Sequence, residues 1–194
     1  MAFSLIESLQ KSSGYPKLLK IDPNTFEVKH PEEVASSDKF AQAAIPVVLI
    51  GVYKYSRTDE GNVSLVQETS SGSPLQLLFG ENKTDVINKV CEYSGETASV
   101  VESKMATIAT DAIRIIREHL DQTPENDQVK DLMTAQRQDI LSYLPGSIQI
   151  GKLLNDETLD DRTNKMEGPV SGIMHKIGQV FSSSGNDKKE EQNF

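Results

Sequence analysis

The sequence predicts an all-α multihelical bundle organised around one long helix. Apolar residues recur every three or four positions over much of the chain, which is the spacing of one helix face. The longest such stretch, 96–120, holds no proline or glycine. Only one short segment, 18–29, suggests a pair of strands. With 37% hydrophobic and 25% charged residues, the 194-residue chain can bury a core of this kind.

The first 70 residues are expected to form a helical unit with a short β-hairpin. Apolar residues at helical spacing over 3–9 predict a first helix, which a Gly-Tyr-Pro sequence ends. The sequence Asp-Pro-Asn-Thr at 22–25 is typical of a turn, and apolar residues flank it. We therefore expect a hairpin over 18–29, although an isolated pair of strands is only marginally stable.

The most apolar run of the chain covers residues 40–53, interrupted by Gln42, Pro46 and Gly51. At 14 residues it is shorter than the roughly 20 that cross a bilayer as a helix. We expect a buried helix that bends at Pro46. The N-terminal residues lack the basic and apolar regions of a secretory signal. Because the single cysteine, Cys91, implies no oxidising compartment, a cytoplasmic protein is expected.

A polar segment rich in Gly and Ser, 58–73, predicts the main domain boundary. It would separate the unit 1–70 from a helical bundle domain, 74–181. Within that domain the apolar stripe of the 96–120 helix must be buried, because burying one Ile or Met is worth roughly 1.5–3 kcal/mol. Residues 182–194 have mixed charge and no apolar periodicity, which predicts a disordered tail.

The last patterned segment, 168–181, is the candidate interaction site. Its apolar residues follow the spacing of one helix face, and its polar side is small and carries few charges. Such a helix packs on its own domain, in a groove of a partner, or at a lipid interface. The candidate interaction face consists of Val170, Ile173, Met174, Ile177, Val180 and Phe181.

Three short sequences between 77 and 99 carry a resemblance to a known family. They are Leu-Leu-Phe-Gly-Glu-Asn at 77–82, Asp-Val-Ile at 85–87 and Ser-Gly-Glu-Thr-Ala-Ser at 94–99. Over about 75–120 the chain resembles the bacterial YidB-like family of uncharacterised helical proteins. The resemblance implies a multihelical fold and brings no established activity. The family's Leu-Pro pair would fall near 109–110, where this chain has no proline.

No set of residues combines a nucleophile, a base and an anion site, so no catalytic, cofactor-binding or metal-binding residue is predicted. The histidines His30, His119 and His175 lie in separate segments, without metal-ligand spacing. Cys91 lies on an apolar helix face, which is typical of an inert thiol. Residues 146–152 spell most of a phosphate-binding loop, but a leucine follows where the motif needs Ser or Thr, and a helix precedes it instead of a strand.

Nucleic acid is disfavoured as a partner because the chain carries a net charge of −9 and would be repelled by a polyanion. A Ser-Gly turn between two predicted helices nonetheless suggests a helix-turn-helix over 84–104. Its expected outer surface carries Glu96 and Glu102 against one base, Lys104. Phosphate contacts need clustered Lys or Arg, which this surface lacks.

Three functions remain as hypotheses. The first is a non-catalytic intracellular protein that acts through protein–protein contacts, with an unidentified partner or as a homo-oligomer. The second is peripheral membrane association through the 168–181 helix, which a single lysine would assist. The third is nucleic-acid binding of the helix-turn-helix kind. An enzyme is the class with the least support in the residues.

Overall fold

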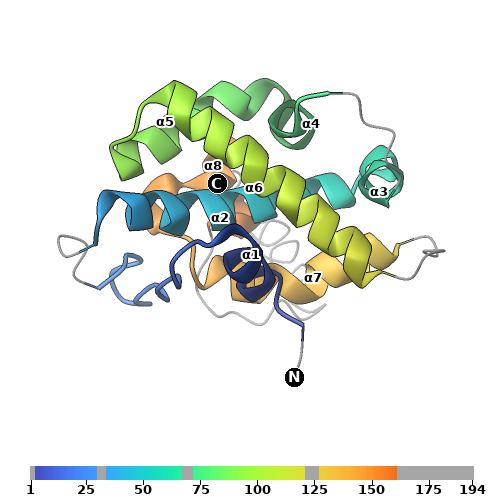
Figure 1. The fold of residues 1–194 in the computed structure, drawn as a ribbon, viewed down its shortest axis with the longest axis horizontal. Helices are drawn as coiled ribbons and strands as arrows, with labels where there is room; N and C mark the ends of the chain where they lie inside the picture. Colours follow the sequence, from blue (N-terminus) through green and yellow to red (C-terminus); the bar gives the residue numbers. More distant parts are fainter. Residues whose placement is uncertain (1–2, 30–33, 67–71, 121–126, 161–194) are drawn as a thin grey trace, which may run out of the picture. The chain divides into compact units, whose positions relative to one another are not determined.

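The computed structural model describes residues 3–29, 34–66, 72–120 and 127–160, all of which belong to one compact unit. Every regular element in this part of the chain is a helix, which confirms the predicted all-α class (Figure 1). The α-helices are α1 (Leu5–Ser13), α2 (Ser36–Ser56), α3 (Asp59–Val66), α4 (Pro74–Phe79), α5 (Lys83–Ser94), α6 (Ala98–His119), α7 (Gln128–Leu141) and α8 (Ile150–Leu153). Single 3₁₀ turns are η2 (Gly80–Asn82), η3 (Gly146–Ile148) and η4 (Glu157–Leu159).

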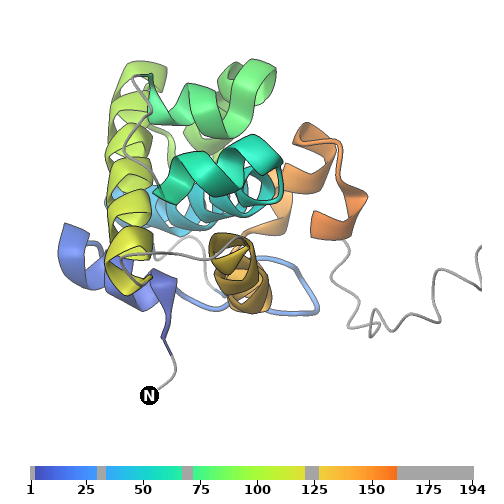
Figure 2. The same ribbon diagram turned by 90° about the vertical axis from the view of Figure 1, so that its right-hand side faces the viewer.

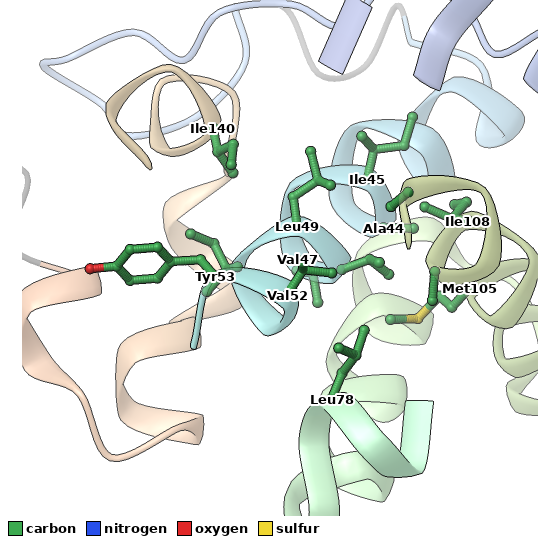
Figure 3. Close-up of a cluster of buried hydrophobic side chains, with 14 of the residues drawn as sticks. Ala44, Ile45, Val47, Leu49, Val52, Tyr53, Leu78, Met105, Ile108 and Ile140 are labelled. Atoms are coloured by element: carbon green, nitrogen blue, oxygen red, sulfur yellow. The ribbon is translucent and has the colours of Figure 1, made fainter. Parts of the chain in front are cut away.

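Helix α2 is the buried centre of these helices, because it is apolar on every side. All its residues from Phe40 to Tyr53 are buried, and the helix continues through Pro46. Figure 3 shows its side chains beside Leu78 of α4, Met105 of α6 and Ile140 of α7. The buried helix predicted for 40–53 is therefore confirmed. None of the described helices, α2 included, has the length and apolarity needed to span a membrane.

Helix α6 is the long helix that the sequence predicts. It spans 22 residues, and its ends fall within two residues of the predicted 96–120. Its inner side packs against α1, α2, α4 and α5, whereas Figure 1 shows nothing drawn over most of its front. The predicted apolar stripe is buried, through Val101, Met105, Ile108, Ala109, Ala112, Ile115 and Ile116.

The β-hairpin predicted for 18–29 is wrong, because these residues form a loop without strands. The predicted turn is present, and the backbone N–H of Phe26 donates to the carbonyl of Asp22 at 2.8 Å. One more backbone hydrogen bond crosses the turn, from the N–H of Asp22 to the carbonyl of Glu27 at 2.9 Å, and the backbone groups of Leu19 bind elsewhere. The buried Gln42 amide of α2 accepts from the N–H of Leu19 at 2.8 Å and donates to its carbonyl at 2.9 Å. A distant side chain thus satisfies the groups that a paired strand would use.

The segment 58–73 does not separate two domains in the structure. Helix α3 lies within it, and α2 on its N-terminal side packs against α5, α6 and α7 on its C-terminal side. The contact across it is close, since a Cβ atom on Gly51 would lie 2.7 Å from the ring of Phe79. The predicted 1–70 and 74–181 units therefore share one core as far as residue 160. The predicted helix at 168–181 and the tail at 182–194 lie outside the described residues.

Candidate interaction site

The described part of the chain contains a groove that the sequence did not predict. Its volume is about 390 Å³, and helices α3, α4 and α6 form its walls. The lining is mostly apolar, with half-buried Pro74 and Leu77 from α4 and Ile113 from α6. Polar groups lie at its edge, chiefly Thr110, Arg114, Arg117 and Glu118 of α6 and Ser64 of α3.

Arg117 holds one wall of the groove in place. Its Nε–H donates to the carbonyl of Leu65 at 2.8 Å, and its Nη2 donates to the carbonyl of Ser64 at 3.4 Å. These carbonyls belong to the last turn of α3, where a cation is favoured by the helix dipole. The side chain therefore joins the end of α3 to α6, across the groove from α4.

Arg114 is the exposed cation at the edge of the groove. Its guanidinium donates to Glu118 at 2.9 Å and to Asp111 at 3.2 Å, both on α6 itself. The hydrogen bonds to these carboxylates raise the pKa of Arg114 above its ordinary value, the bond to Glu118 most. Because exposed ion pairs contribute little stability, this guanidinium can exchange its partners for those of another molecule.

The outer face of α6 continues from the groove toward the start of the helix. We use this name for Ser99, Val100, Ser103, Thr107 and Thr110, all of which are exposed. The hydroxyls of Thr107 and Thr110 donate to backbone carbonyls one turn back, at 3.2 and 3.0 Å. These hydroxyls are satisfied within the helix, so the threonines leave their methyl groups available for contact.

Charge is absent from this face, although a quarter of the chain's residues are charged. The five residues of the face are uncharged, and the charged residues on either side of Ser103 in the sequence, Glu102 and Lys104, have side chains that are 46% and 41% exposed. The nearest cation, Lys104, donates to both carboxylate oxygens of Glu96 at 2.8 Å. Depletion of charge distinguishes the centre of a protein interface from ordinary surface, so the pattern favours a contact site.

The helix-turn-helix prediction finds little support in the charges at the α5–α6 corner. Lys104 is bound to Glu96 there, and Lys83 pairs with Glu102 at 2.9 Å. Within this described corner the basic side chains are thus held by carboxylates of the same chain. A phosphate would have to displace those carboxylates before it could bind.

The segment that resembles a phosphate-binding loop is filled by the chain itself. The backbone N–H groups of Gly151 and Lys152 donate to the two carboxylate oxygens of Asp160, at 2.9 and 2.8 Å. Backbone N–H groups are what such a loop would offer to a phosphate. A Cβ atom on Gly151 would also lie 2.8 Å from the Asp160 carboxylate, which shows how closely this acid is packed. The sequence match is therefore a structural turn.

Of the residues considered for chemistry, His119 and Cys91 have packing roles, whereas His30 and His175 lie outside the described residues. His119 stacks on Phe3, with ring centroids 3.7 Å apart and planes 9° from parallel. Cys91 is half-buried on α5, and desolvation raises the pKa of its thiol, which keeps it in the less reactive protonated form. Across residues 3–29, 34–66, 72–120 and 127–160, no three His, Cys, Asp or Glu side chains come together in a group that could hold a metal ion.

The predicted face at 168–181 lies outside the described residues, so the structure does not place it against the groove or elsewhere. Sequence reasoning missed the groove because its three walls come from separate segments between residues 64 and 118, which meet only in the folded chain. One signal was available. The residues at 99, 103, 107 and 110 are all Ser or Thr at helical spacing, which indicates one uncharged side of a helix.

Comparisons with protein-family models, with characterised proteins and with solved structures gave no match. The resemblance to the YidB-like family stays a prediction from three short motifs.

Proposed function

We propose that this chain is a non-catalytic cytoplasmic protein that acts through protein–protein contacts, and that the groove with the outer face of α6 is a contact site. The observation that carries the proposal is the uncharged outer face of α6, which leads into a mostly apolar groove. Interfaces combine an apolar hollow with a centre depleted of charge and a charged edge. Arg114 and Glu118 supply that edge here.

The non-catalytic part of the proposal draws on the packing of the reactive side chains. The thiol of Cys91 has a raised pKa, and His119 lies flat against an aromatic ring at the end of α6. Neither residue lines the groove. The groove's own polar groups are a threonine, a serine and paired charges, which suit binding better than proton transfer.

The face at 168–181 is proposed as a second contact surface, on the strength of its apolar spacing alone. No contact within the described residues favours the membrane or nucleic-acid alternatives over protein contact. The cytoplasmic assignment is supported by the single cysteine, since proteins of oxidising compartments commonly use cysteines in pairs.

Site-specific photocrosslinking in the native cell tests the proposal. A photoreactive amino acid at position 110, beside the groove, should yield a discrete protein adduct. The matched control is position 134, an exposed threonine of α7 whose hydroxyl also donates one turn back, at 2.6 Å. Adduct formation at 110 and not at 134 would support the groove as a contact site. Equal labelling at the two positions, or none at 110, would contradict the proposal.

A further inference from the structure

We infer that the loop 17–29 binds the surface of an anionic lipid bilayer, with Phe26 and Leu19 inserted among the lipids. This surface is separate from the groove, so the inference goes beyond the proposed function. Four large apolar residues are highly exposed among the described residues, and two of them, Leu19 at 47% and Phe26 at 41%, lie on this one loop. The other two, Val63 and Val100, lie on two different helices.

Phe26 is held in a backbone conformation that a bulky residue does not favour. Its φ of 58° lies in the left-handed region, where glycine and asparagine are preferred. The conformation is fixed from both sides, because its N–H donates to the carbonyl of Asp22 and its carbonyl accepts from the N–H of Gly146 at 2.7 Å. Since the residue also stays 41% exposed, the fold gains little from a phenylalanine here. A strained residue that the fold does not need indicates a contact outside the chain.

The loop directs its exposed residues away from the helices. Its inner side is attached to the fold through Leu18 and Val28, each 3% exposed, and through the N–H of Ile21, which donates to the carbonyl of Ser142 at 2.9 Å. Figure 1 shows the loop in blue at one end of the described helices, below the start of α2. The apolar projection is thus already ordered, so that binding requires no further ordering of the backbone.

The exposed charges of the loop are positive. Three lysines are exposed: Lys17, Lys20 and Lys29. The two carboxylates are used within the fold, since Asp22 pairs with Lys29 at 3.5 Å and is 15% exposed, and Glu27 accepts from the N–H of Ser147 at 2.9 Å. Neither Lys17 nor Lys20 pairs with a carboxylate of the described residues, and the ammonium of Lys20 lies 5.6 Å from the ring centre of Tyr143.

Apolar side chains between exposed lysines match the interface of an anionic bilayer. Lysine stems extend along apolar surface while their ammonium groups reach the phosphates. A protein partner would need a hollow shaped to this projection, whereas a bilayer accommodates it without one. The net charge of −9 does not prevent binding, because salt screens the membrane field within roughly 10 Å. Carboxylates on the far side of the molecule therefore experience little of it.

Cosedimentation of the full chain with vesicles tests the inference. One vesicle is phosphatidylcholine and phosphatidylglycerol in equal parts, and the other is phosphatidylcholine alone. Phe26→Asn removes the ring and suits the left-handed backbone, so it should lower the partition coefficient on anionic vesicles by about tenfold without lowering the thermal midpoint. The matched control is Val63→Asn on α3, 50% exposed and at the opposite end of the described helices (Figure 1). It should leave vesicle binding unchanged.

A lysine pair tests the electrostatic part. Lys20→Gln should lower the partition coefficient on anionic vesicles by about fivefold and leave that on phosphatidylcholine unchanged. The control Lys130→Gln acts at the start of α7, next to Asp127, whose carboxylate accepts from Asn62 of α3 at 3.4 Å. This lysine lies at the α3 end, so its loss should have no effect. Raising the salt concentration should weaken binding of the parent to anionic vesicles.

Tryptophan fluorescence reports insertion directly, because the chain has no tryptophan of its own. Phe26→Trp should show an emission maximum that moves to shorter wavelength on addition of anionic vesicles. Lipids brominated on their acyl chains should quench this emission. Val63→Trp provides the matched control on α3, and its emission should change in neither experiment.

The outcomes separate this loop from other routes to a membrane. A full chain that does not bind anionic vesicles would overturn the inference. Binding that Phe26→Asn leaves intact would overturn it too, and would assign the membrane contact to another segment, such as 168–181. An unshifted and unquenched indole at position 26 has the same meaning. Each of these results leaves the proposed function standing, because the crosslink at position 110 reports on the groove.

Discussion

Helices α2 and α6 have nearly the same length and opposite surroundings. Helix α2 is 21 residues long, and its central part is buried on every side. Helix α6 has 22 residues, a buried inner side and an uncharged outer face. The first helix has all its partners within the described chain. The second has a surface of interface character that no described element covers, which is why we assign the contact to α6.

The largest expected effect contrasts one side chain from each helix. Leu49→Ala in α2 removes a side chain that is 0% exposed, and we expect a loss of about 3 kcal/mol in the free energy of unfolding. Val100→Ala on the outer face of α6 should change it by roughly 0.5 kcal/mol or less, since that side chain is already in water. Urea denaturation of both variants at one protein concentration measures the difference. Similar losses would show that the outer face of α6 is covered within the chain.

The buried amide of Gln42 should show the next largest effect. It accepts from the N–H of Leu19, and its amide nitrogen donates to the carbonyls of Leu19 and Tyr143, at 2.9 and 2.6 Å. Gln42→Ala leaves these buried partners unsatisfied and should cost about 2 kcal/mol. Faster amide hydrogen exchange at Leu19 would locate the loss in the 18–29 loop.

A second variant, Gln42→Glu, separates the two roles of this amide. It keeps the acceptor oxygen and replaces the amide donor by a carboxylate oxygen. It should be at least as damaging as Gln42→Ala, because the new oxygen would face two carbonyls. A variant Gln42→Ala that unfolds at the same urea concentration as the parent would contradict the assigned role of this amide.

Close packing of α2 against α4 predicts a smaller effect. A Cβ atom on Gly51 would lie 2.7 Å from two ring atoms of Phe79 and 3.3 Å from Leu78. Gly51→Ala should therefore cost about 1–2 kcal/mol, because the buried ring has to move. Gly72→Ala is the control, since nothing lies within 4 Å of a Cβ atom there. A stabilised Gly51→Ala variant would mean that α2 and α4 separate more easily than the structure indicates.

Local patterns predicted some of these elements and could not predict others. The 96–120 helix was predicted because its continuous apolar stripe indicates a helix with one buried side. The buried 40–53 helix was predicted from its apolar run. Both patterns lie within the segment itself. The 18–29 hairpin was wrong although its turn was right. Strands need hydrogen-bonding partners, and here Gln42 supplies them from a distant helix.

The packing across the 58–73 segment and the groove were both missed for a related reason. Gly- and Ser-rich composition at 58–73 marks irregular chain, but it does not say that α2 packs beyond it on α5, α6 and α7. The groove likewise exists only where α3, α4 and α6 meet. Contacts between distant segments are set by the shapes of complete side-chain surfaces, which spacing along one helix does not encode.

The smallest effect concerns a residue of intermediate burial, Tyr93 on α5. Desolvation, with a further contribution from the nearby Glu27 carboxylate, raises the pKa of its phenol from 10.0 to about 12. The folded state therefore holds this proton more tightly than the unfolded chain does. The stabilisation is fully present below pH 10 and is lost as the pH rises toward 12. Solvent screening at this partly exposed group keeps the change modest.

Unfolding free energies of the parent and of Tyr93→Phe, measured in urea at several pH values from 8 to 12, isolate this contribution. Tyr15 and Tyr143 also have raised pKa values, so both proteins should lose stability at high pH. The parent should lose more, because only it carries the Tyr93 proton. Superimposable pH profiles would mean that Tyr93 is as hydrated in the folded state as in the unfolded one, and its environment would then resemble the outer face of α6 more than the interior around α2.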